Sequence, residues 1–224
     1  MLKYKKYDID PNKPLPAQLS REYWETFAKL ILEKYHPSKF YDLSVDGEKP
    51  DLRNEKANIG IEVTSVENEK SREIESLYSR QYSYGNNKQK EKALRRIKEL
   101  GGKTEKYFLM HPVVNRDIGK IYAAVKSKTK KLNNNYTVFD ENYLLIFDTN
   151  LVLDEELPEM LENIVESSVG VISFKTVFLY CFGGDLYDFN VYNKTYNHHE
   201  ECNSTVQQLA INARHIIIEK YNRA

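Results

Sequence analysis

Two acidic residues lie close together in the sequence, each in or beside a short segment with β-strand character. Asp51 follows Pro50, and Glu62 lies inside the apolar, β-branched segment of residues 59–64. This segment has the composition of a buried strand, so Glu62 is a carboxylate within it. A buried carboxylate needs either a cation from the protein or a divalent metal that binds oxygen ligands. The two acids are therefore candidates for metal-dependent chemistry.

Each acid also has a simpler interpretation when it is considered alone. Asp51 is of a type that is common in turns after proline. Glu62 can be an edge-strand acid that pairs with a lysine such as Lys56. Because the two acids occur together, with apolar neighbours on both sides of Glu62, we prefer metal binding.

Length and composition set limits on the class of protein. The 224 residues are enough for one sizeable core, and we expect a single domain. Lys and Arg number 33, as do Asp and Glu, so no net charge attracts the whole molecule to nucleic acid or to a membrane. The amino terminus lacks the apolar core of a signal peptide, and no run approaches the roughly 18 apolar residues of a membrane helix. We therefore expect a cytoplasmic protein without membrane contact, with Cys181 and Cys202 as reduced thiols.

Hydrophobic periodicity predicts a mixed α/β chain. The first half reads as a helix over residues 21–32, three strands near residues 40–45, Asp51 and residues 59–64, and a polar stretch over 69–100. That stretch predicts either one long helix or two helices divided near residues 85–87. The second half predicts strands at 107–110 and 143–148, helices at 117–132 and 155–168, a hairpin of 176–181 with 186–192, and a closing helix at 204–221.

The order of helix, three strands carrying Asp and then Glu, helix and strand, with Pro50-Asp51 and Glu62-Val63-Thr64, resembles the PD-(D/E)xK, or restriction-endonuclease-like, nuclease superfamily. The resemblance implies an α/β fold with a restriction-endonuclease-like core, in which helices flank a central mixed β-sheet. The core would cover residues 19–150, approximately, and the hairpin and helix of residues 151–224 would complete a single domain of residues 1–224.

The resemblance also implies a metal site. Asp51 and Glu62 would hold Mg²⁺ or Mn²⁺, with the backbone carbonyl of Val63 as a third ligand. An acid of the first helix, Glu25 or Glu22, would complete the site, and Glu25 is preferred.

The chain departs from the motif at Thr64, which occupies the position of the motif lysine and cannot carry its positive charge. The cation would then come from elsewhere, with Lys70 or Lys88 as candidates, or a second metal would replace it.

These features imply metal-dependent hydrolysis of phosphodiester bonds, with DNA as the expected substrate. A homodimer is possible, because cutting both strands of a duplex calls for two sites. The alternative is a catalytically inactive nuclease-like module that binds nucleic acid or a protein partner.

Two further patterns suggest a function but also have a simple structural interpretation. The basic run of residues 120–131 can follow a phosphate backbone or can be the solvated end of a helix. The adjacent residues His198 and His199 lie in a polar segment that we expect to be a loop, and they lack the spacing of zinc ligands. We therefore do not expect zinc there.

Overall fold

The structure is a computed structural model that describes residues 9–10, 15–45, 50–66, 69–80, 86–105, 108–110, 117–135, 137–148, 152–181, 184–200 and 203–223. Its internal contacts divide the chain into two compact units. The sheet unit comprises Trp24–Val66 and Asn115–Ala210, and the helical unit comprises Met1–Tyr23, Glu67–Val114 and Ile211–Ala224. The single domain expected over residues 1–224 stays a prediction.

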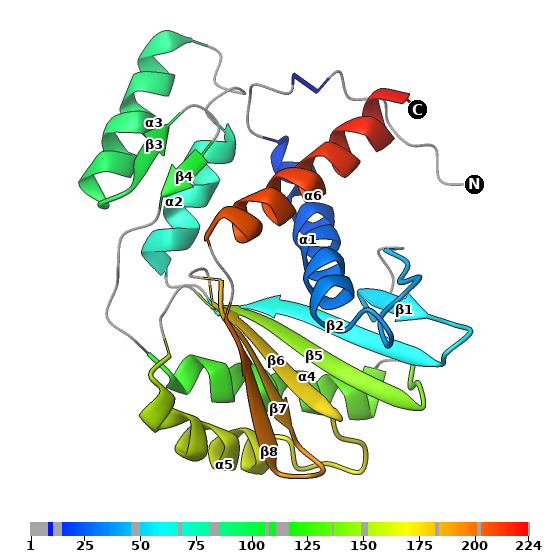
Figure 1. The fold of residues 1–224 in the computed structure, drawn as a ribbon. Helices are drawn as coiled ribbons and strands as arrows, with labels where there is room; N and C mark the ends of the chain where they lie inside the picture. Colours follow the sequence, from blue (N-terminus) through cyan, green and yellow to red (C-terminus); the bar gives the residue numbers. More distant parts are fainter. Residues whose placement is uncertain are drawn as a thin grey trace. The chain divides into compact units, whose positions relative to one another are not determined.

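A six-stranded mixed sheet forms the centre of the sheet unit (Figure 1). The strand order is β1-β2-β5-β6-β7-β8. Strands β2, β5 and β6 run parallel, whereas β1, β7 and β8 pair antiparallel with their neighbours. The strands are β1 (Leu52–Asn54), β2 (Ile59–Ser65), β5 (Glu141–Asp148), β6 (Thr176–Cys181), β7 (Leu186–Asn190) and β8 (Thr195–His199). The predicted α/β class with a mixed sheet is confirmed.

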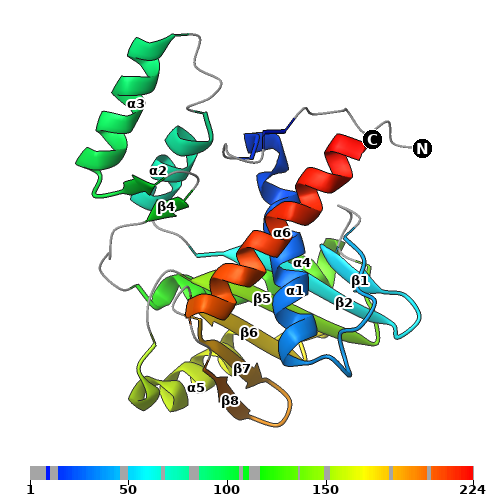
Figure 2. The same cartoon turned by 45° about the horizontal axis from the view of Figure 1, so that its top comes forward.

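Helices cover both faces of this sheet, as Figures 1 and 2 show. Side chains alternate along β5, so Leu144 and Ile146 join the core formed with α4 (Gly119–Asn135) and α5 (Leu157–Ser167). Phe147 points to the opposite face, where it stacks on Phe27 of α1 (Ser20–Tyr35) with ring centroids 5.7 Å apart. A short 3₁₀ helix, η2 (Asp154–Glu156), precedes α5. We call the face of the sheet that α4 and α5 cover the α4 face, and the face that α1 covers the α1 face.

The helical unit contains the polar stretch of residues 69–100. It holds η1 (Ala17–Leu19), α2 (Glu69–Arg80), α3 (Asn87–Glu99) and the hairpin of β3 (Lys103–Glu105) with β4 (Phe108–Met110), together with most of α6 (Asn203–Arg223). Ile74 and Tyr78 of α2 pack on Ile97 of α3. A second apolar cluster includes Ile9 and Leu19 with Ile217 of α6. None of the described helices is long and apolar enough to cross a membrane.

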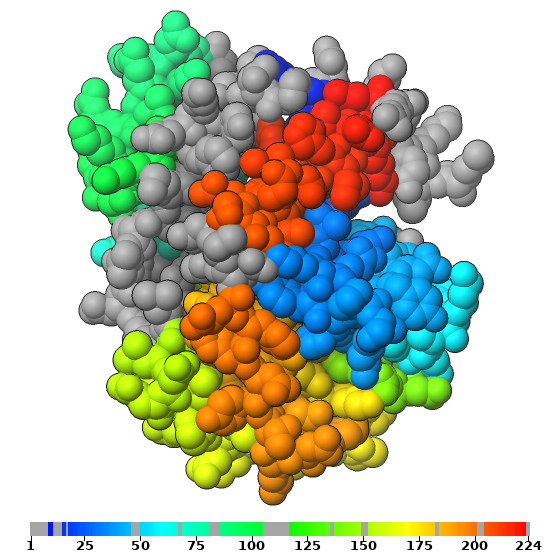
Figure 3. All heavy atoms as spheres, viewed as in Figure 1, coloured from blue at the N-terminus to red at the C-terminus, as the bar shows by residue number. Residues whose placement is uncertain are grey.

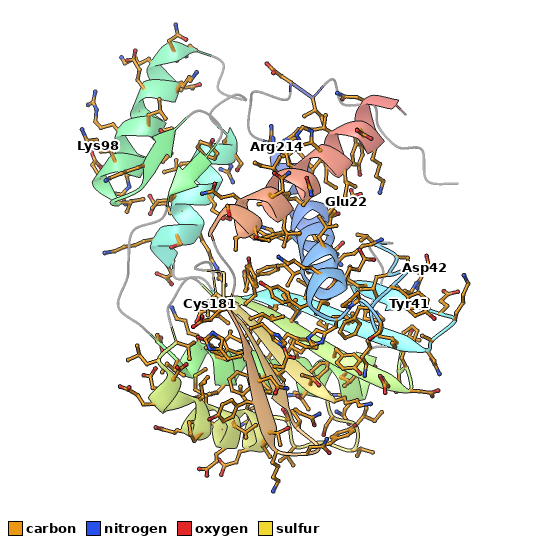
Figure 4. The ribbon with its side chains drawn as sticks, in the orientation of Figure 1. Glu22, Tyr41, Asp42, Lys98, Cys181 and Arg214 are labelled. Carbon is orange, nitrogen blue, oxygen red and sulfur yellow. The ribbon has the colours of Figure 1, made fainter. Side chains whose placement is uncertain are left out.

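Most predicted elements are present, one open alternative is decided, and two predictions differ from the structure. Of the two alternatives for residues 69–100, the structure forms two helices. The strand expected over 40–45 is reduced to one bridge between Ser44 and Arg53. The loop expected around His198 and His199 was a wrong prediction, because both lie in β8. Residues 195–197 of β8 are exposed, so no apolar alternation marks the strand in the sequence. Cys181 is a buried thiol at the end of β6 (Figure 4), and Cys202 lies outside the described residues.

Glu141 anchors the start of β5 through three neighbours. Its carboxylate accepts hydrogen bonds from Lys175 and from the Tyr143 hydroxyl, and Lys39 Nζ lies 3.0 Å away. Partial burial acts to raise the pKa of Glu141, but hydrogen bonds from Lys175, Tyr143 and Lys39 outweigh it and lower the pKa to about 2. The charged form of Glu141 therefore stabilises the folded sheet.

We expect Glu141→Gln to flatten the acid side of the stability profile. Because the folded pKa of Glu141 is about 2, below its ordinary value of 4.5, its contribution is present above pH 4.5 and is lost as the pH falls toward 2. Urea unfolding at pH 7 and pH 3 should show a smaller pH difference in this variant than in the wild type. Glu159→Gln, which changes an exposed acid of α5, is the control. An unchanged pH difference in Glu141→Gln would contradict this account.

Candidate active site

The register of the β1–β2 pair brings Asp51 beside Glu62. Leu52 pairs with Ile61 in this antiparallel ladder, so the next position places Asp51 opposite Glu62. Residues directly opposite one another in such a pair direct their side chains to the same face. Asp51 is only 7% exposed, and its Oδ2 accepts a 2.8 Å hydrogen bond from the backbone N–H of Val63. The Asp51 side chain thus continues the hydrogen bonding of the ladder just before β1 begins.

The turn between the two strands fixes this register. Asn54, at the end of β1, accepts a hydrogen bond from the backbone N–H of Ala57 on Oδ1, and its amide nitrogen donates to the carbonyl of Tyr41 at 2.8 Å. Asn58 has φ of 51°, a left-handed conformation that asparagine tolerates better than most residues. A slip of one residue would move Glu62 to the other face, so this turn holds the acid pair together.

Glu62 meets a lysine of α4 on the α4 face. It lies opposite Leu144 in the parallel β2–β5 pair, and its Oε1 accepts a hydrogen bond from the ammonium group of Lys128. The side chain of Glu62 is 5% exposed and that of Lys128 is 16% exposed. Charges this buried are stable only in close pairs, because removing them from water carries a large penalty. The structure therefore places an ammonium group at the acid pair.

Gly60 makes room for the segment that carries Asp51. A Cβ atom at this position would lie 2.8 Å from Cγ of Pro50 and 2.7 Å from Cδ2 of Phe139. Phe139 is held in turn by Asn142, whose side-chain amide nitrogen donates to its carbonyl at 2.7 Å. Gly60 thus allows Pro50, and with it Asp51, to approach β2 closely.

Thr64 and Val63 follow Glu62 along β2. Thr64 is half-buried, lies opposite Ile146 and shares the face of Glu62, since side chains alternate with a period of two. Thr64, which stands where the resemblance places the motif lysine, therefore points to the side of the sheet that α4 and Lys128 cover. Val63 donates its N–H to Asp51, which fixes the backbone between the two acids.

The two acids of α1 that the sequence proposes as ligands belong to different units. Glu25 is buried on α1, the helix that packs on the α1 face through Phe27, whereas Glu62 meets Lys128 on the α4 face. Glu22 belongs to the helical unit, where it accepts hydrogen bonds from Lys220 and, at 2.6 Å, from the hydroxyl of Tyr221 (Figure 4). Glu22 therefore pairs within the helical unit, and Glu25 belongs to a helix on the face of the sheet opposite to that of Lys128.

The lysine at Glu62 differs from those considered from the sequence. Lys70 is exposed on α2 and Lys88 is exposed on α3, both in the helical unit. Nζ of Lys56, the ion-pair partner in the alternative interpretation of Glu62, lies 3.2 Å from Oδ2 of Asp42 on the surface. In the sequence, Lys128 is one of several lysines in the basic run over 120–131.

The sequence carries a signal for the inward position of Lys128. On α4, the buried residues Ile121, Val125 and Leu132 form a stripe, and Lys128 falls within it at helical spacing. Lys126, Lys130 and Lys131 are exposed on the same helix. A lysine on the apolar stripe of a helix must find an anion, and Glu62 is that anion.

Comparison of the chain with protein-family models, curated proteins and solved structures gives no match. The assignment of a function therefore depends on the geometry of the site.

We expect Gly60→Ala to destabilise the protein by about 1–3 kcal/mol, because the added methyl group meets the rigid ring of Pro50 and the ring of Phe139. Urea unfolding measures this change. The control is Gly119→Ala at the start of α4, where the new Cβ would meet the Asp117 carboxylate at 3.2 Å. Equal stabilities of the two variants would contradict the close approach at Gly60.

We expect Lys128→Met to cost about 3–5 kcal/mol, since it removes the cation from a buried carboxylate. Combining it with Glu62→Gln should recover part of the loss, and Lys130→Met on the exposed side of α4 should change stability by less than about 0.5 kcal/mol. A double-mutant cycle of unfolding free energies measures the coupling. Additive effects of the Lys128 and Glu62 substitutions would show that the two side chains do not interact.

Proposed function

We propose that the chain is a metal-dependent nuclease that hydrolyses phosphodiester bonds, with DNA as the substrate. The observation that carries the proposal is the ammonium group of Lys128 on Glu62, next to Asp51. Two carboxylates and one ammonium group are the charged groups that the PD-(D/E)xK motif brings together. Here the lysine comes from α4 in place of Thr64.

The order of elements in the sheet unit supports the proposal. Helix α1 is followed by the bridge at Ser44, the antiparallel pair β1–β2, helix α4 and strand β5, which lies parallel to β2. The helix and strand that the resemblance placed directly after Glu62, in residues 69–100 and 107–110, belong to the helical unit, and we propose that α4 and β5 take their places in the core. Strands β6, β7 and β8 would then extend that core within the same sheet.

The donor atoms at Asp51 and Glu62 suit a hard divalent cation. Both carboxylates are buried, Asp51 just before β1 and Glu62 opposite it on β2. Mg²⁺ and Mn²⁺ prefer such oxygen ligands. We propose that Asp51, Glu62 and the carbonyl of Val63 would hold the ion, and neither Glu22 nor Glu25 is needed for it. When bound, the ion would polarise the phosphate and lower the pKa of the attacking water.

The protein groups would position and stabilise the substrate. Lys128, fixed by Glu62, would present its ammonium group to the negative charge that develops on the phosphate. The exposed residues Lys126, Lys130 and Lys131 of the same helix would contact the nucleic-acid backbone. Cleavage of both strands of a duplex would call for two copies of the site, hence a homodimer.

A second candidate is a nuclease-like module without activity. It is favoured by the fact that Asp51 and Glu62 already bind protein groups, namely the N–H of Val63 and the ammonium group of Lys128. In that case the Glu62–Lys128 pair would serve the stability of the sheet, and the module would bind nucleic acid or a protein partner.

Lys128→Gln should lower the rate of Mg²⁺-dependent DNA cleavage by about 10²–10³-fold, since it removes one preorganised cation from the reacting phosphate. Plasmid cleavage measures the rate, and calorimetry measures Mg²⁺ binding on the same samples. Lys128→Gln should still bind Mg²⁺, whereas Asp51→Asn and Glu62→Gln should lose it. Lys92→Gln, which changes an exposed lysine of α3, is the control and should cleave at about the wild-type rate.

Two results would contradict the proposal that the chain is a nuclease. Cleavage that is indifferent to Lys128 would remove the observation on which the proposal depends. A wild type that binds DNA without cleaving it in Mg²⁺ or Mn²⁺ would favour the inactive module.

A further inference from the structure

Three residues from the end of α1 and from the β7–β8 hairpin direct ligand-type atoms to one point of the sheet unit. His36 Nε2 and His199 Nε2 each lie 3.0 Å from Oδ2 of Asp188. One ligand atom from each residue lies within 4.8 Å of the other two. The rings of His36 and His199 meet at 87°, with centroids 5.3 Å apart.

The fold brings these residues together on the α1 face. Asp188 of β7 lies opposite Phe178 of β6, whose ring contacts the ring of His36 directly after α1. His199 of β8 is the diagonal neighbour of Asp188, because Asp188 pairs with Asn197, two residues earlier. In Figure 3 the segment at the end of α1 (blue) and the β7–β8 hairpin (orange) lie side by side at the surface.

Hydrogen bonding within the described residues does not satisfy this cluster. His199 has a hydrogen bond to Oδ2 of Asp188, but His36 approaches the same oxygen without hydrogen-bond alignment. In the part of the chain that the structure describes, His36 Nε2 and Asp188 Oδ1 are both buried with no hydrogen-bond partner. Buried polar atoms without partners are rare and indicate a missing ligand or water.

We propose that His36, Asp188 and His199 form a binding site for a divalent ion of the borderline class, of which Zn²⁺ is the best fit. Zinc bonds to imidazole nitrogen and carboxylate oxygen are about 2.0–2.2 Å long, so the ligand atoms around one ion are roughly 3.0–3.5 Å apart. Two of the three separations here are 3.0 Å. Two imidazoles and one carboxylate suit Zn²⁺ and its neighbours in the first transition series better than Mg²⁺.

Partial exposure of the two imidazoles allows an ion to enter. The side chains of His36 and His199 are 24% and 32% exposed, whereas that of Asp188 is 8% exposed. Three protein ligands leave a fourth position of a tetrahedral ion open to water. Such an ion would join the end of α1 to the β7–β8 hairpin and would stabilise the folded state by mass action.

This site is independent of the proposed nuclease site. It uses the α1 face at β7 and β8, whereas Asp51, Glu62 and Lys128 lie at β1, β2 and α4. The inference therefore stands or falls separately from the proposed function.

Neighbouring residues on β8 provide a matched pair of variants. His198 precedes His199, but its ring stacks on Tyr187 at 4.4 Å, on the α4 face. We expect His199→Ala and Asp188→Asn to weaken Zn²⁺ or Co²⁺ binding more than about tenfold, and His198→Ala to retain it. Calorimetry with Zn²⁺ and the visible absorption of bound Co²⁺ measure binding. The Asp51→Asn variant should also retain it, which separates this site from the acid pair.

A measurement on the wild type guards against variants that fail to fold. Of the five histidines in the chain, the imidazole nitrogen NMR signals of two should shift on addition of one equivalent of Zn²⁺. The thermal midpoint should rise with the concentration of Zn²⁺ in the wild type and not in His199→Ala. Absence of Zn²⁺ and Co²⁺ binding in the wild type, or full binding by His199→Ala, would overturn the proposal and leave a hydrogen-bonded cluster of two imidazoles and a carboxylate.

Discussion

The buried charge of Glu62 is the constraint on which the candidate active site depends. A carboxylate inside a strand that is covered by α4 must meet a cation within the structure, and Lys128 of α4 supplies it. This pairing fixes α4 over β2, while the β1–β2 turn at Asn54 and Asn58 fixes Asp51 beside Glu62. One electrostatic requirement and one strand register thus account for the convergence of three charged side chains from three elements.

The local pattern of the sequence is enough to predict most of the fold. Strands β5 and β6 are buried on both faces and read as continuous apolar runs, and the helices carry clear stripes. Strand β8 could not be found in this way, because its first three residues are exposed and it depends on pairing with β7. The bridge at Ser44 is likewise set by its partner Arg53 rather than by its own residues.

The acid pair was accessible from the sequence because Glu62 interrupts an apolar strand, but its cation was not. Lys128 lies 66 residues from Glu62, whereas Lys56 and Lys70, two of the lysines considered from the sequence, lie within eight residues of it. The stripe of Ile121, Val125 and Leu132 indicates that Lys128 points inward, yet it does not say which acid it meets. Only the parallel pairing of β2 with β5, across the crossover through α4, supplies that information.

The same argument explains where polar clusters can lie in this sheet. The central strands β5 and β6 are packed on both faces by apolar and aromatic side chains, so charged groups find little room along their middle. At both ends the sheet becomes antiparallel, and alternate residues become available for polar roles. Asp51 and Glu62 use one end on the α4 face, and His36, Asp188 and His199 use the other on the α1 face. Adjacency in sequence misleads at this second end, because strand alternation sends His198 and His199 to opposite faces and leaves only His199 with Asp188.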